Sequence, residues 1–360
     1  MGCFEIKLKN EYYRKVKEIN KKNDLYRSFL LRSSETNNEY AYKYIDVSAL
    51  NQGEKNKILN EIEYLKKIIH PNIIELKNAY YSDDNKFLNV ITEYSEEGTL
   101  QMKLDQQKEK GQYFDGNTLI NWFYQICLAL EFIHNKKILH RDINPSNIFL
   151  MKDNFAKLGN FGLAKDFSPS LIRSTTMVTS QEYLAPEVIK DKSFKYETDI
   201  WALGVTFYQL IILDYPFEGK SIEEKYKNIE KGNIKPIPKD CKIDNQFIEI
   251  IAKMVLVRPE ERLPLKEILD KSIIKQRIKC YLRENNFNHL ETIKTLEQFD
   301  NEEDKKEKTI PVVIENDEEE KKESKESKEK KEKEIKEYKE KIVHYTLLRH
   351  MTLIEKIVKN

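Results

Sequence analysis

The stretch ILHRDINPSNIFL, from Ile138 to Leu150, holds the densest group of reactive side chains in the sequence. Asp142 can accept a proton from a hydroxyl group, and Arg141 supplies a fixed positive charge. Asn147, five positions after Asp142, offers a neutral oxygen atom to a cation. Either spacing alone, HxD or DxxxxN, is a weak indication. The surrounding sequence therefore has to support it.

Two further motifs follow in the chain. KLGNFGLAK, from Lys157 to Lys165, is typical of a strand end, a turn and a new helix or loop. Its turn places Asn160 where a metal site would use a carboxylate. APE then occupies residues 185–187. Three such motifs in this order exceed what chance agreement would give.

With these motifs on it, the chain from Tyr13 to about Gln276 resembles a eukaryotic protein kinase. DIWALG, starting at Asp199, resembles the buried helix that anchors the catalytic loop. The wording WFYQICLALEFIHNKKILHRDI is most similar to the NIMA-related serine/threonine kinases. The resemblance implies an α+β fold of two lobes, a small β-rich lobe at 13–93 and a larger helical lobe at 95–277.

The hydrophobic pattern favours the same fold class. Short apolar strands are expected at 40–45 and 87–92, around one helical segment, KNKILNEIEYLKKII. In that segment Ile58, Ile62 and Leu65 recur at helical spacing and predict one buried face. From Asn121 onward the chain becomes helical, with segments predicted at 121–139, 180–190, 198–213, 221–231, 247–256 and 265–276.

The ends of the chain differ in composition from this region. Residues 1–12 form an N-terminal extension, in which Gly2 and Cys3 could be acylated and give weak membrane association. Residues 278–334 form a charged linker dominated by Glu and Lys. Residues 335–358 carry an apolar stripe and are predicted as an amphipathic helix. That helix needs a partner, which could be a second copy, another protein or the chain's own folded domain.

Charge and cysteine content exclude several classes of protein. A net charge of +1 and a pI of about 7.6 argue against a nucleic-acid binder. The four cysteines are far apart and form no CxxC pair, so neither a zinc ribbon nor a disulfide framework is predicted. The longest apolar stretch, residues 200–213, is too short to span a bilayer. We therefore expect a cytoplasmic protein.

The resemblance implies a nucleotide site with ATP and Mg²⁺ as cofactors. It makes Lys43, in AYKYI, the lysine that pairs with the ATP phosphates, and Glu61 the helix carboxylate that positions it. The spacing of both residues to HPN at His70 agrees with this assignment. The Glu93 carbonyl and the Ser95 amide would face adenine.

The resemblance also assigns the catalytic positions. Asp142 matches the catalytic base, and Asn147 and Asn160 stand at the two Mg²⁺-ligand positions. Asn144 stands where these kinases place a lysine that steadies the transferring phosphate. Arg141 would receive a phosphate from the activation segment, where the candidate acceptors are Ser174, Thr175, Thr176 and Thr179.

Other matched positions are structural. Glu187 and Arg262 should form the buried ion pair of the large lobe. Thr92 would be the gatekeeper beside the nucleotide. The hydrophobic spine that links the lobes would consist of Leu65, Leu76, His140 and Phe161.

Three departures from the kinase pattern weaken phosphate handling. The glycine-rich loop reads EINKKNDLYRSFLL, without glycine, so bare backbone amides cannot approach phosphates there; such a loop could simply close a β-hairpin. Asn160 removes a negative charge beside the metal, worth at least about 4 kcal/mol at an effective dielectric of about 20. Asn144 removes electrostatic stabilisation of the transition state.

These losses leave three hypotheses. The first is a catalytically impaired, pseudokinase-like scaffold or regulator of a protein partner. The second is an active but slow ATP-dependent serine/threonine kinase that phosphorylates protein substrates. The third takes the tail at 335–358 as a dimerising coil and the kinase-like domain as secondary.

Overall fold

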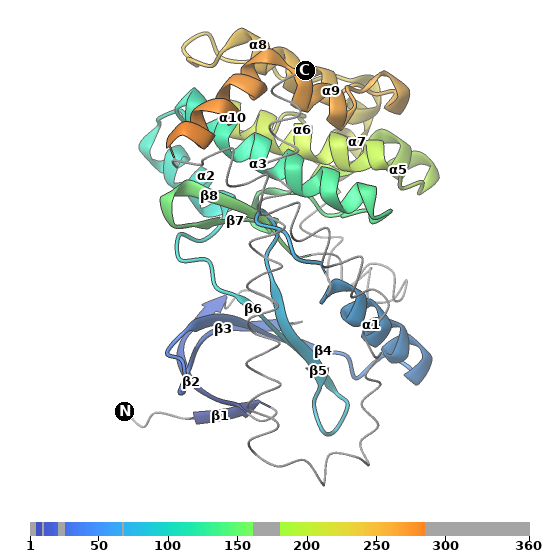
Figure 1. Cartoon of the computed structure of the whole chain (residues 1–360). Helices are drawn as coiled ribbons and strands as arrows, with labels where there is room; N and C mark the ends of the chain where they lie inside the picture. Colours follow the sequence, from blue (N-terminus) through green and yellow to red (C-terminus); the bar gives the residue numbers. More distant parts are fainter. Residues whose placement is uncertain (1–4, 9–10, 21–25, 67, 161–180, 285–360) are drawn as a thin grey trace, which may run out of the picture. The chain divides into compact units, whose positions relative to one another are not determined.

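The computed structural model describes residues 5–8, 11–20, 26–66, 68–160 and 181–284 of the chain (Figure 1). The chain divides into two units, residues 1–68 with 72–274, and residues 69–71 with 275–360. The first unit contains the β-rich region and the helical region up to Ile274. The α+β class and the division into a β-rich N-lobe and a helical C-lobe are confirmed.

The N-lobe is an antiparallel sheet of six strands with the order β1-β2-β3-β4-β6-β5. Its connections are short, except that helix α1 (Gln52–Leu65) separates β4 from β5. The strand bounds are β1 Glu5–Leu8, β2 Glu11–Asn20, β3 Tyr26–Ser33, β4 Glu39–Asp46, β5 Leu76–Tyr81 and β6 Phe87–Glu93. The N-terminal extension thus contributes an edge strand, β1, which the sequence pattern did not predict.

Period-two alternation gives this sheet two apolar faces. On one face, Leu88 and Val90 of β6 pack with Ile58 and Ile62 of α1, as the helical spacing of these isoleucines predicts. On the other face lie Tyr13, Phe29, Leu31, Tyr42 and Ile91. Lys43 is the register partner of Val90 and therefore lies on the α1 face of the sheet.

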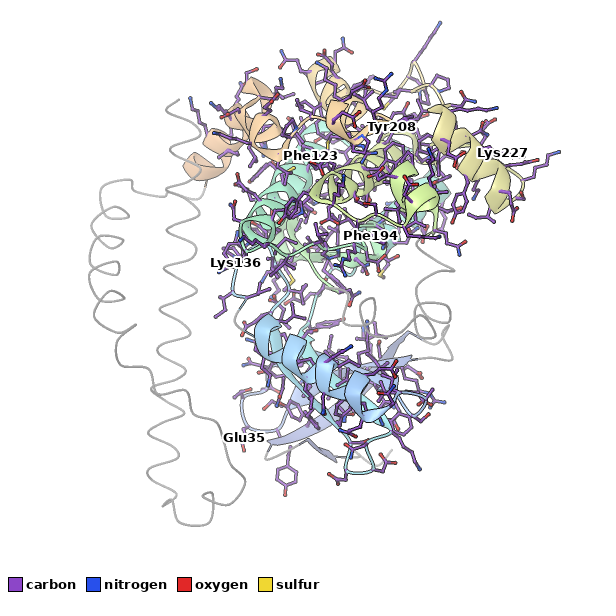
Figure 2. All side chains as sticks on the ribbon, turned by 90° about the vertical axis from the view of Figure 1, so that its right-hand side faces the viewer. Glu35, Phe123, Lys136, Phe194, Tyr208 and Lys227 are labelled. Atoms are coloured by element: carbon purple, nitrogen blue, oxygen red, sulfur yellow. The ribbon has the colours of Figure 1, made fainter. Side chains whose placement is uncertain are left out.

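The C-lobe is helical apart from the short hairpin β7–β8. Its helices are α2 Leu100–Lys110, α3 Gly116–Asn135, α5 Pro186–Asp191, α6 Tyr196–Ile212, α7 Ile222–Lys231, α8 Asn245–Met254, α9 Leu265–Asp270 and α10 Ser272–Glu284; the strands are β7 Ile148–Met151 and β8 Phe155–Leu158. Helix α3 packs against α6, and α6 packs against α8. Phe123 of α3, labelled within the helices in Figure 2, contacts Phe207 and Phe247 edge-on at centroid distances of 5.0 and 5.2 Å.

Two predicted helices are corrected by the structure. The segment 180–190 is a 3₁₀ turn at Gln181–Tyr183 followed by α5, because Pro186 forces an extended conformation on Ala185. The segment 265–276 is interrupted at Lys271, whose ψ of 139° ends α9. Helix α2, absent from the predicted segments, begins at the N-cap Thr99 and ends at Gly111, whose φ is 61°.

Among the described residues, no helix is long and apolar enough to cross a membrane. Strands β2 and β3, which contain most of the glycine-free segment, pair in antiparallel fashion. Residues 21–25 between them lie outside the described residues, as do Gly2, Cys3 and the predicted helix at 335–358.

Candidate active site

The loop between α3 and β7 is held by one buried carboxylate. Asp199, near the start of α6, accepts hydrogen bonds from the backbone N–H groups of His140 at 2.9 Å and Arg141 at 2.8 Å. The ring Nε2 of His134 lies 2.8 Å from the same carboxylate. These bonds stabilise a left-handed turn at Arg141, whose φ is 64°. DIWALG therefore anchors the catalytic loop, as the resemblance implied.

His140 joins this loop to the end of β8. Its ring Nδ1 accepts the backbone N–H of Asp142 at 3.3 Å, so Nε2 carries the proton and donates to the Gly159 carbonyl at 3.0 Å. A Cβ on Gly159 would lie 2.8 Å from side-chain atoms of Ile74 and Phe149, which is too close for a larger residue. The packing of Ile74 and Phe149 against Gly159 holds the backbone immediately before Asn160.

Three amide side chains form a connected hydrogen-bond system around Asp142. Asn144 Nδ2 donates to the Asp142 backbone carbonyl at 3.0 Å and to its carboxylate Oδ1 at 3.2 Å. Asn147 Nδ2 donates to the same backbone carbonyl at 2.7 Å. Asn160 Nδ2 donates to Asn147 Oδ1 at 2.8 Å. The structure thus brings together all four residues to which the sequence assigns catalysis or metal binding.

Lys43 completes the group from the N-lobe. Its ammonium Nζ donates to Asn160 Oδ1 at 3.1 Å. Burial lowers the pKa of Lys43 to about 8, an effect that the nearby Asp142 carboxylate opposes. Asn160 has a φ of 55°, a conformation that asparagine tolerates better than most residues. Its neutral amide thereby replaces a carboxylate as the partner of a cation.

Glu93 and Ser95 lie at the end of β6 and just beyond it. The Glu93 carboxylate accepts two hydrogen bonds from Lys157 Nζ, each 2.8 Å long, and one from the backbone N–H of Glu75. The buried Ser95 hydroxyl lies 2.7 Å from the Gly98 carbonyl and 2.6 Å from the Leu150 carbonyl. Both side chains therefore hold the local backbone in place. The expected contacts to adenine use the Glu93 carbonyl and the Ser95 amide, and these contacts stay predictions.

Several predicted residues lie outside what the structure describes. Glu61 is within α1, but its side chain is not among the described ones. Phe161 of the predicted spine and the candidate phosphoacceptors at 174–176 and 179 fall within residues 161–180, which are also not described.

The predicted ion pair of the large lobe is confirmed. Arg262 NH1 and NH2 each donate to the Glu187 carboxylate at 2.7 Å, and the Arg262 side chain is fully buried. Three further bonds run from this guanidinium to backbone carbonyls of Glu197, Leu256 and Val257.

Comparison with known proteins agrees with this geometry. Residues 27–274 match the family described as "Protein kinase domain". The chain belongs to the protein kinase family. It is 32% identical to serine/threonine-protein kinase Nek1 of Mus musculus over 256 aligned residues, and this alignment covers 71% of this chain and 21% of Nek1. Over 269 residues it is 31% identical to Nek5 of Homo sapiens, with 73% of this chain and 37% of that protein covered.

These relatives place the kinase domain among serine/threonine protein kinases similar to the NIMA-related ones. Nek4 of Mus musculus is 30% identical over 253 residues, which are 70% of this chain and 31% of that protein. The matches therefore span about a fifth to two fifths of the relatives' lengths. Members of this family generally use ATP with Mg²⁺.

The described donor set does not fit Mg²⁺ well. Mg²⁺ in proteins is usually bound through one or two carboxylates in octahedral geometry. Here the two residues at the metal positions, Asn147 and Asn160, are neutral amides, and both amide oxygens already accept hydrogen bonds. Among the described residues, no group of three or more His, Cys, Asp or Glu side chains could hold a metal ion.

Sequence reasoning missed three contacts in this kinase domain. It did not predict the hydrogen bond from Asn144 to Asp142, the ion pair of Lys157 with Glu93, or the hydrogen bond between His134 and Asp199. For Asn144 a signal existed, because asparagine commonly bonds to backbone groups two residues away. The other two contacts join residues more than sixty positions apart, and no local pattern encodes them.

Proposed function

We propose that this chain is a catalytically impaired serine/threonine kinase-like protein that acts as a scaffold or regulator of a protein partner. The observation that carries the proposal is the neutral amide system around Asp142. Asn144 and Asn160 stand at two positions where phosphotransfer would use a charged side chain, a lysine and a metal-binding carboxylate, and Asn160 donates to Asn147 at the second metal position. Catalysis of phosphoryl transfer depends almost entirely on such positioning and charge.

Asn144 affects the proposed base directly. Its Nδ2 donates to Asp142 Oδ1, so one carboxylate oxygen is engaged before a substrate hydroxyl arrives. Asparagine also carries no charge with which to stabilise the transferring phosphate. Removing one such electrostatic group from an enzyme typically costs about 10²–10³ in rate.

The retained groups have a structural use in this proposal. Lys43 donates to Asn160, and the Asp142 backbone carbonyl accepts from both Asn144 and Asn147. These contacts hold the end of β8 to β4 and to the catalytic loop without any nucleotide chemistry. The kinase fold would then present a partner-binding surface of fixed shape.

The test is transfer of radiolabelled phosphate from ATP to a generic protein substrate by the full chain, with Asp142→Ala as the matched control. We expect no transfer above that of Asp142→Ala. Transfer by the unaltered chain that disappears in Asp142→Ala would overturn the proposal. That result would support the alternative, an active but slow serine/threonine kinase.

The alternative is favoured by one observation. Lys43, Asp142 and Asn147 are assembled in one hydrogen-bonded group, in the relative places that the family uses. In that case Glu93 and Ser95 would bind adenine through their backbone groups, and Glu61 would position Lys43. Its protein substrate would be selected by the segment that precedes α5.

A cytoplasmic location with a protein partner completes the proposal, and no nucleic acid is expected as a partner. Cys127, Cys241 and Cys280 are free thiols, which is compatible with a reducing compartment. If Gly2 and Cys3 are acylated, part of the protein would associate with membranes. A fluorescent C-terminal fusion with and without Gly2→Ala tests this. Identical diffuse fluorescence from both fusions would exclude membrane association through an acylated N-terminus.

A further inference from the structure

The hydrogen-bond system formed by the side chains of Lys43, Asn160 and Asn147 contains one cation and no carboxylate, whereas a Mg²⁺ site usually includes one or two carboxylates. The Asn160 Oδ1 atom faces the Lys43 ammonium at 3.1 Å. The Asn147 Oδ1 atom faces the Asn160 NH₂ group at 2.8 Å. Both oxygen atoms that could ligate a cation therefore already point at hydrogen-bond donors.

A divalent cation bound to Asn160 Oδ1 would lie next to the Lys43 ammonium with no negative charge from residue 160 between them. Like charges at such distances repel strongly in a partly buried site. The Asp142 carboxylate acts on Lys43 from beside this system, and its Oδ1 already accepts from Asn144 at 3.2 Å. The system thus disfavours a cation.

The same system favours an anion. A carboxylate at position 160 would repel the phosphates of a nucleotide, and a metal ion would be needed to bridge the two anions. The Asn160 amide exerts no such repulsion, and its NH₂ group can donate its second hydrogen to a phosphate oxygen while the first stays on Asn147 Oδ1. The Lys43 ammonium then supplies the positive charge directly.

We infer that the Lys43–Asn160–Asn147 system binds the phosphate groups of a nucleoside di- or triphosphate without a divalent cation. This inference rests on the proposed function, because binding without metal fits a site that regulates and does not transfer phosphate. Nucleotide binding then stabilises the folded state of the domain and acts as the regulatory signal.

The experiment is calorimetric titration of the full chain with ATP and ADP, each in excess EDTA and in excess Mg²⁺. We expect affinities in the two conditions that agree within about threefold. Binding that appears with Mg²⁺ and vanishes in EDTA would overturn the inference, and so would no binding in either. Tripolyphosphate is the third ligand, and an affinity equal to that of ATP would overturn the nucleoside part.

Variants separate the role of each residue. Lys43→Met should abolish binding in both conditions, whereas the matched control Lys77→Met, a lysine of β5 paired with Glu75, should leave it unchanged. Asn160→Asp should weaken binding in EDTA at least about tenfold and make it depend on Mg²⁺. Melting each variant without ligand verifies folding, and Asn147→Asp gives a second test of the same charge effect. Equal binding by Lys43→Met would overturn the inference.

The outcomes of this experiment and of the phosphotransfer assay are independent. Phosphate transfer that depends on Asp142 overturns the proposed function whatever the titration gives. Metal-dependent or absent binding overturns the inference and leaves an impaired kinase in place.

Discussion

At the scale of single residues, Asn160 combines a left-handed backbone with a neutral side chain. Its φ of 55° is accessible to asparagine and to aspartate, so the turn does not require the amide. What the amide changes is charge, because Lys43 now donates to a neutral oxygen atom. The loss of a carboxylate here concerns chemistry more than shape.

The first prediction concerns Asn160→Asp. We expect its phosphotransfer to stay at least about 100-fold below ordinary kinase turnover, because Asn144 still supplies no charge to the transferring phosphate. The measurement is single-turnover transfer from radiolabelled ATP. The double variant with Asn144→Lys should gain more than either single variant. Ordinary turnover from Asn160→Asp alone would show that neither Asn144 nor the glycine-free loop limits phosphotransfer.

The second prediction concerns the buried pair of Arg262 and Glu187. Arg262→Met should lower the free energy of unfolding by about 3–5 kcal/mol, because it leaves the Glu187 carboxylate without its cation. Urea denaturation measures this loss. The control is Arg258→Met, which removes an exposed pair with Glu261 and should cost at most about 1 kcal/mol. Equal losses in both variants would contradict the prediction.

Some contacts between these residues could be predicted from the sequence and others could not, for physical reasons. Glu187 with Arg262 and Asp199 with the catalytic loop could be anticipated, because the kinase resemblance fixes both partners. Asparagine commonly bonds to backbone two residues away, which could have indicated the bond from Asn144 to the Asp142 carbonyl, but nothing indicated its bond to the Asp142 carboxylate. That bond depends on the rotation of a short amide, which the spacing of residues does not determine.

At the scale of elements, α3 is the centre of the helical lobe. It is apolar on more than one face, and residues on every side of it are buried, including Trp122, Phe123 and Leu130. Helices of this kind are stabilised by packing more than by their own propensity. Its start is fixed by Asp115, which accepts the backbone N–H of Thr118 at 2.9 Å.

The third prediction concerns Phe123 of α3. Phe123→Ala should cost about 3–5 kcal/mol of stability, because it leaves a cavity between Phe207 and Phe247. The urea midpoint at constant slope reports the change. Met102→Ala on α2 is the control, since that side chain is 53% exposed and should cost about 0.5 kcal/mol or less. A loss for Phe123→Ala as small as the control would refute the packing role.

Elements were predictable where one periodic pattern governs them. Helix α1 follows from Ile58, Ile62 and Leu65, and the strands β4 and β6 follow from their apolar runs. The predicted segments 180–190 and 265–276 were wrong in their continuity, because single backbone angles at Ala185 and Lys271 interrupt them. Apolar spacing carries no information about such angles.

At the scale of the whole molecule, the fourth prediction concerns the predicted helix at 335–358. If its apolar stripe pairs with a second copy, the full chain should self-associate and should lose that association on removal of the residues after Asp300. Size-exclusion chromatography with light scattering measures both masses. A monomer in both cases would exclude a second copy as the partner. The thermal midpoint of the shortened chain verifies that its kinase domain stays folded.

The hold of Asp199 on the catalytic loop has a consequence for how this lineage could change. Two backbone N–H bonds and His134 secure the loop, and none of them involves residue 144 or 160. Asparagine and aspartate codons differ at one nucleotide, and so do those of asparagine and lysine. Point mutations could therefore remove or restore chemistry at either position without breaking the bonds by which Asp199 holds the catalytic loop.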